Sequence, residues 1–116
     1  DESLVPIPNL EPSPALEAIS NFIADQTCDG ACIQMGIGDL STAVGFGLRN
    51  KNDLGIHSEM MGDSMMELVK RGNVTNTRKA YLPGVSSAAF LSPAGPVGSC
   101  LDELSFFAAI SLYLLI

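Results

Sequence analysis

Basic residues are scarce in this sequence. The chain of 116 residues has six Lys and Arg against thirteen Asp and Glu, and its formal net charge is −7. No stretch gathers positive charge into the stripe that contacts a nucleic-acid backbone, so nucleic acid is not an expected partner. Charged residues make up only 16% and hydrophobic residues 47%, which indicates one modest globular domain and not a disordered chain.

Cysteine is also rare, and its spacing does not suit a metal site. Cys28, Cys32 and Cys100 are odd in number, three residues separate the first two, and no second pair completes a zinc site. We expect no metal, and free, largely buried thiols in a reducing compartment. The N-terminus has no basic segment followed by an apolar run, so no signal peptide is expected. A cytoplasmic location is predicted, or a mitochondrial one in a eukaryote.

An apolar run long enough to cross a membrane is missing. The uncharged end of the chain, Leu104 to Ile116, is shorter than the roughly 20 residues that a spanning helix needs. We expect a buried helix or strand there, or, if it is left uncovered, self-association. Residues 92–116 form a divergent apolar segment, and residues 1–13, with three prolines, are predicted to be an extended linker.

Residues 14–91 alternate helical and strand patterns. Ser13 followed by Pro14 predicts a helix over residues 14–25, and the next helix begins at Asp39 or Ser41 as its cap. A third helix is expected to be capped by Asp63, to direct Met65, Leu68 and Val69 inward and to end at residues 72–73. Short apolar runs predict strands over residues 31–35, 54–58, 80–82 and 85–91. The expected class is therefore α/β, three-layer-like, with a mostly parallel sheet and flanking helices.

A glycine turn, Gly36-Ile37-Gly38, joins the first predicted strand to the second helix. Such a turn leaves several backbone amides unpaired and lets a ligand approach closely, so it can hold a phosphate or stabilise an oxyanion. The alternative is a tight turn without a ligand. A third glycine and the acidic residue of the dinucleotide fingerprint are missing, which argues against NAD. P-loop, HExxH and serine-elbow motifs are missing as well.

Glu59 follows the predicted strand over residues 54–58. The carboxyl ends of parallel strands are where open α/β sheets place their sites, although a solvated loop carboxylate or a helix cap is the alternative. A carboxylate that acts as a nucleophile needs donors that hold its charged form, and Gln34, Ser58 and the amides after Met60 are candidates. His57 either polarises the site or is structural. The methionines line an acyl pocket or pack the core: Met35, Met60, Met61, Met65 and Met66.

These motifs resemble a known family. The segments that carry the resemblance are Gln34–Val44, with its Gly-Ile-Gly turn, Leu54–Met60, with its His-Ser-Glu-Met motif, Met66–Val69 and Gly72–Asn76. Together they are similar to the acetyl-CoA hydrolase/transferase family, in particular its 4-hydroxybutyrate and butyrate:acetate CoA-transferases. The resemblance covers roughly Pro14 to Leu91 and matches the early part of the second of that family's two α/β halves. A fragment, a truncated product or a shifted reading frame would each explain this.

The resemblance implies that Glu59 is the nucleophile and that five residues contact CoA: Gly36, Ile37, Gly38, Asp39 and Leu40. It implies transfer of CoA between an acyl-CoA and a short-chain carboxylate through a glutamyl-CoA thioester, with CoA as substrate and no permanently bound cofactor. The other expected partner is the remainder of the enzyme or a second copy of the chain, and no membrane is involved. Acetyl-CoA hydrolysis and a non-catalytic module that binds CoA or a partner are the alternatives.

Overall fold

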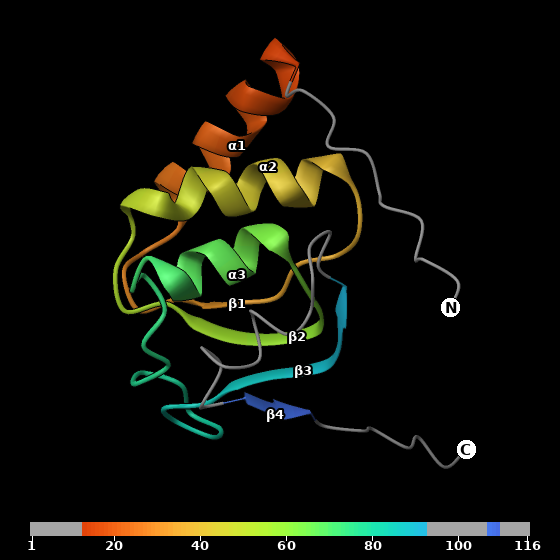
Figure 1. The fold of residues 1–116 in the computed structure, drawn as a ribbon. Coiled ribbons are helices and arrows are strands. Elements are labelled where there is room, and N and C mark those ends of the chain that lie inside the picture. The colour runs from red at the N-terminus through yellow and green to blue at the C-terminus, as the bar shows by residue number, and fades with distance from the viewer. Residues whose placement is uncertain (1–12, 93–106, 110–116) are drawn as a thin grey trace, which may run out of the picture.

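The computed structural model describes residues 13–92 and 107–109 (Figure 1). Strands alternate with helices in the order α1 (Pro14–Gln26), β1 (Cys32–Ile33), α2 (Asp39–Gly47), a 3-10 turn η1 (Leu48–Asn50), β2 (Gly55–Gly62), α3 (Asp63–Lys70), β3 (Ser86–Ser92) and β4 (Phe107–Ala109). All neighbouring strands are parallel, in the order β1-β2-β3-β4. The predicted α/β class with a parallel sheet and flanking helices is therefore confirmed.

The helices are stacked on one side of the sheet, and α1 lies farthest from the strands (Figure 1). Helix α1 packs on α2, and α2 packs on α3. None of the helices within residues 13–92 is long and apolar enough to cross a membrane. The predicted linker before Ser13, Cys100 and most of the segment over residues 92–116 lie outside the described residues.

Helix α1 begins as predicted, and it packs through its small residues. The Ser13 hydroxyl accepts a hydrogen bond from the Leu16 amide at 3.3 Å, which caps the helix. The buried residues of α1 are Ser20 and Ala24, whereas Ile19 is 44% and Phe22 66% exposed. Ser20 Oγ donates to the Ala43 carbonyl of α2 at 2.7 Å. Small residues thus bring the two helices together, and the larger apolar ones remain at the surface.

The main core lies between β2, β3 and α3. Its buried residues are Ile56, Met61, Met65, Met66 and Ala88. A second buried cluster joins Leu48, Leu54 and Leu68 to Ala24 of α1. The prediction that Met65 and Leu68 point inward is confirmed, because they are 1% and 0% exposed. Asp63 is the first residue of α3 and not its cap, since Gly62 occupies the N-cap position.

The loop between α3 and β3 ties the starts of β2 and β3 together. Asn76, with φ 59°, accepts a hydrogen bond from the Ile56 amide through Oδ1 and donates through Nδ2 to Ser86 Oγ, both at 2.9 Å. Lys79 Nζ donates to the Ile56 carbonyl at 2.8 Å, and also to Val85 and Ser87.

Two further predictions on local structure are wrong. The strand expected over residues 80–82 is a bend, in which Leu82 has φ 49°, a value that a strand residue does not adopt. The thiols of Cys28 and Cys32 are free, as expected, but both cysteines are exposed and not buried. Cys32 belongs to the two-residue strand β1, which leaves its side chain uncovered.

Lys79 yields a test of this packing. Burial lowers the pKa of its ammonium below the ordinary value of 10.5. Between the lowered pKa and 10.5, the unfolded chain binds a proton that the folded chain has released, so stability rises with pH across that range. We expect the free energy of unfolding of wild type, relative to Lys79→Met, to increase between about pH 7 and about pH 10 in urea denaturation. A difference that stays constant or decreases would contradict this.

Candidate functional site

The glycine turn lies between β1 and α2. Gly36, Ile37 and Gly38 are all exposed, and Gly38, with φ 114°, is the N-cap of α2. A φ in this region favours glycine, because a Cβ would be strained there. No side chain caps α2, so the predicted capping by Asp39 or Ser41 is wrong. Within the described part of the chain, no backbone hydrogen bond is donated by the three amides of the turn.

Asp39 and Leu40 occupy the first turn of α2 and are exposed. The five residues predicted to contact CoA therefore lie together at one helix N-terminus. Because the first amides of a helix have no intrahelical acceptor, this end of α2 presents a row of donors to a ligand. Gln34 is exposed at the approach to the turn.

A small pocket of about 40 Å³ opens beside the turn. It is enclosed by the turn, the first residues of α2, the end of β2 and the first residues of α3: Met35, Gly36, Gly38, Ser41, Thr42, Met60, Gly62, Ser64 and Met65. Of the methionines predicted for an acyl pocket, three line this space, while Met61 and Met66 belong to the core. Met65 of α3 was one of the methionines offered for such a pocket, whereas the contribution of Gly62 and Ser64 was not expected from the sequence.

Ser58 holds the turn in place. Its hydroxyl donates to the Met35 carbonyl at 3.1 Å and accepts from the Met35 amide at 3.2 Å. Ser58 is 7% exposed, and its single proton is used in this contact. Ser58 is therefore a positioning residue for the glycine turn, whereas the sequence suggested that it stabilises the Glu59 carboxylate.

Glu59 lies inside β2, not after it, because the strand continues to Gly62. The burial pattern alternates from Ile56 to Met60, with His57 and Glu59 exposed and Ser58 buried. Since strand residues two apart share a face, His57 and Glu59 point to one side of β2, and Ser58 and Met60 to the other. The Glu59 carboxylate is therefore not part of the small pocket.

His57 has an aromatic neighbour on its side of the strand. The Tyr81 ring lies at a centroid distance of 5.9 Å from the imidazole, with an angle of 44° between the planes. Tyr81 was not predicted as a site residue. The segment that holds it looks like a strand in the sequence, whereas in the structure residues 80–82 form a bend in the loop between α3 and β3.

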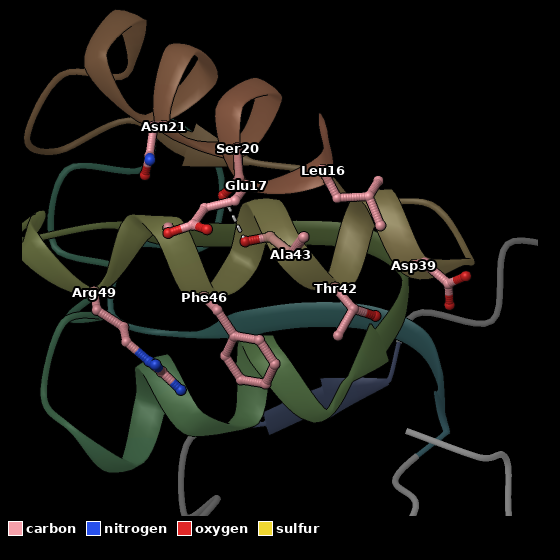
Figure 2. A pocket seen from close by; sticks show the side chains of 10 residues that line it. Leu16, Glu17, Ser20, Asn21, Asp39, Thr42, Ala43, Phe46 and Arg49 are labelled. Atoms are coloured by element: carbon pink, nitrogen blue, oxygen red, sulfur yellow. Dashed lines mark hydrogen bonds between the residues drawn. The ribbon is translucent and has the colours of Figure 1, made fainter. Parts of the chain in front are cut away.

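A larger pocket of about 320 Å³ lies between α1 and α2 (Figure 2). It includes Phe46 and Arg49, and the Arg49 guanidinium lies over the Phe46 ring at 4.4 Å while it pairs with Glu67 at 2.7 Å. Among the predicted site residues, only Asp39 lines it. This pocket results from the packing of two helices, which periodicity in the sequence does not reveal.

The chain is thus a parallel α/β segment whose candidate site combines a glycine turn with unpaired amides and a glutamate exposed on a strand. No protein-family model matches the chain. The 4-hydroxybutyrate coenzyme A transferase of Clostridium kluyveri is 47% identical over 75 residues, which are 65% of this chain and 18% of that protein.

The fold of the chain also matches parts of solved structures. The crystal structure of RipA from Yersinia pestis matches 89% of this chain and 24% of its own, with a TM-score of 0.77 and 35% identity. The 4-hydroxybutyrate CoA-transferase from Porphyromonas gingivalis matches with a TM-score of 0.70 and 27% identity, over 89% of this chain and 27% of its own. The resemblance to CoA-transferases of the 4-hydroxybutyrate type is confirmed. The chain spans only between 18% and 27% of these three proteins.

The role of Ser58 is testable by hydrogen exchange. In Ser58→Ala, the Met35 amide and carbonyl lose their partner, which costs about 1.4 kcal/mol for local opening. We expect amide exchange at Met35 to accelerate about tenfold, measured by NMR. Exchange in the middle of α1 serves as the internal control and should stay unchanged. Equal acceleration throughout the chain would show that Ser58 contributes only to global stability.

Proposed function

We propose that this chain carries the nucleophile and part of the CoA site of a CoA-transferase. The observation that supports this most is the placement of Glu59 on an exposed face of β2, next to the strand–turn–helix unit that holds the five predicted CoA contacts. The similarity to CoA-transferases covers this same region. Moving CoA between an acyl-CoA and a short-chain carboxylate is the reaction that these residues fit.

The proposed reaction has two symmetrical halves. The Glu59 carboxylate attacks the thioester carbonyl, the C–S bond breaks, and an acyl-glutamyl anhydride and CoA thiolate form. The thiolate then attacks the glutamyl carbonyl, which releases the first carboxylate and leaves a glutamyl-CoA thioester. An acceptor carboxylate attacks this thioester to give a second anhydride, and the thiolate takes the new acyl group and frees Glu59.

Each step passes through an oxyanion, which needs hydrogen-bond donors aimed at it. Removing one such donor typically lowers the rate by about 10²–10³. From the sequence, the backbone amides of the glycine turn were expected to stabilise this oxyanion. Because the turn and Glu59 are on different sides of β2, we assign the turn to CoA, and we assign His57, which shares the face of Glu59, to the oxyanion.

The exposure of Glu59 bears on the activity of the chain by itself. A hydrated carboxylate is a weak nucleophile, and a closed site removes that hydration. No described residue covers Glu59, and the relatives are several times longer than this chain. We infer that the remainder of such an enzyme, or a second copy, closes the site. With water in place of the acceptor carboxylate, the same intermediate would give acetyl-CoA hydrolysis.

The proposal is tested by trapping the intermediate. The chain is incubated with acetyl-CoA, quenched with hydroxylamine and analysed by mass spectrometry. We expect a hydroxamate on Glu59 that forms slowly, because the chain alone leaves this carboxylate hydrated. It should be absent in Glu59→Gln and still form in Glu17→Gln, a matched change on the exposed face of α1. His57→Ala should slow adduct formation about 10²-fold. Modification of other carboxylates with Glu59 untouched would contradict the assignment.

A further inference from the structure

Tyr81 is an exposed aromatic residue beside the face of β2 that the helices do not cover. Its side chain is 59% exposed. The other large apolar residues that are exposed in the described part of the chain belong to α1, the glycine turn and α2: Ile19, Phe22, Ile37 and Leu40. Among the described residues, Tyr81 is therefore the only one of this kind next to the face that carries Glu59.

The loop that carries Tyr81 is fixed on both sides of this residue. Before Tyr81, the buried Lys79 donates from Nζ to the Ile56 carbonyl at 2.8 Å. After Tyr81, the Gly84 amide donates to the Asn76 carbonyl at 2.9 Å, and the Asn76 side chain accepts from the Ile56 amide. Because the loop is held against β2, the ring is a preformed surface, and a ligand that covers it pays little to order it.

The Tyr81 ring contacts the imidazole of His57. The two centroids are 5.9 Å apart and the planes are tilted by 44°, an arrangement that aromatic pairs favour. Residues two apart on a strand share a face and are separated by about 6.6 Å, so Glu59 is the next residue along this face of β2. His57 thus has Tyr81 as one neighbour and Glu59 as the other.

The direction of the strands sets the orientation of a bound thioester. The glycine turn leaves the sheet at the end where the parallel strands finish, whereas the loop between α3 and β3 enters it at the end where they start (Figure 1). CoA at the glycine turn therefore reaches Glu59 from the carboxyl end of β2. The acyl chain is bonded to the thioester carbonyl opposite the sulfur, so it points toward the start of β2, where His57 and Tyr81 lie.

We propose that the acyl chain of the substrate packs on the ring of Tyr81, and that Tyr81 sets the preference for acyl length. Packing removes apolar surface of both the chain and the ring from water. An acetyl group ends beside His57, whereas a butyryl group extends further and covers the ring. This inference rests on the CoA-transferase function proposed above, and it adds a residue of the loop between α3 and β3 to the site.

The test compares thioesters that differ in acyl length. The rate of hydroxamate formation on Glu59 is measured with acetyl-CoA and with butyryl-CoA at low concentration. We expect butyryl-CoA to react about fivefold faster, because each fully covered methylene contributes about a factor of four and the open face covers the chain only in part. Tyr81→Ala should abolish this preference and leave the acetyl-CoA rate unchanged, and Tyr81→Phe, which keeps the ring, should retain the preference.

The control is Phe22→Ala, which removes another exposed aromatic ring, on α1. It should leave both rates and the preference unchanged. Equal slowing of acetyl-CoA and butyryl-CoA in Tyr81→Ala would mean that Tyr81 only positions His57, and would overturn the acyl assignment. A hydroxamate on Glu59 with a preference that survives in Tyr81→Ala would support the transferase function and overturn this inference.

Contact with the acyl chain is also measured without chemistry. In the Glu59→Gln chain with butyryl-CoA, we expect nuclear Overhauser effects between the acyl methyl group and the ring protons of Tyr81. Their absence would overturn the proposal. Because this experiment keeps Tyr81, it holds even if Tyr81→Ala does not fold. If no hydroxamate forms on Glu59 in any variant, the transferase function fails, and the Overhauser effects alone decide whether Tyr81 binds the acyl chain.

Discussion

The two hydrogen bonds between the Ser58 hydroxyl and the backbone of Met35 are the contact on which the site depends. Strand β1 pairs with β2 only through Cys32 with Gly55 and Ile33 with Ile56. Beyond Ile33 the backbone leaves the sheet, so that the amides of the turn become free for a ligand. Because the amides of the turn are unpaired, the hydrogen bonds between β1 and β2 cannot hold the turn in position. Ser58 replaces the ladder at this point and fixes the turn against β2.

Close approach of the helices sets the position of the pocket. At two places on α2, glycine faces a serine of a neighbouring helix: Gly45 faces Ser64 of α3, and Gly47 faces Ser20 of α1. A Cβ at Gly47 would lie 2.3 Å from Ser20 Oγ. Larger residues would separate α2 from α3 and move their N-termini apart. Because α1 contacts α2 through Ser20, the side chains of Ile19 and Phe22 on α1 remain exposed.

The sequence predicted the elements better than their contacts. The cap at Ser13, the inward residues of α3 and the parallel order all follow from local patterns. The strand β2 was expected to stop at its first carboxylate, yet it continues, because Glu59 points to an uncovered face and costs no burial. The same Gly-Asp pair precedes both pocket helices, at Gly38 and at Gly62. That both pairs meet at one pocket depends on the three-dimensional packing of α2 and α3, which no local pattern contains.

Strand β2 separates the pocket beside the glycine turn from the Glu59 carboxylate. Met60 faces the pocket at the helix N-termini, and Glu59 faces the other side. A ligand that reaches from the glycine turn to Glu59 would therefore have to pass the carboxyl end of β2. Gly62 is the last residue of that strand, and no atom lies within 4 Å of the place where its Cβ would be. The open space at Gly62 thus leaves a path around the end of the strand, and a side chain at this position would narrow it.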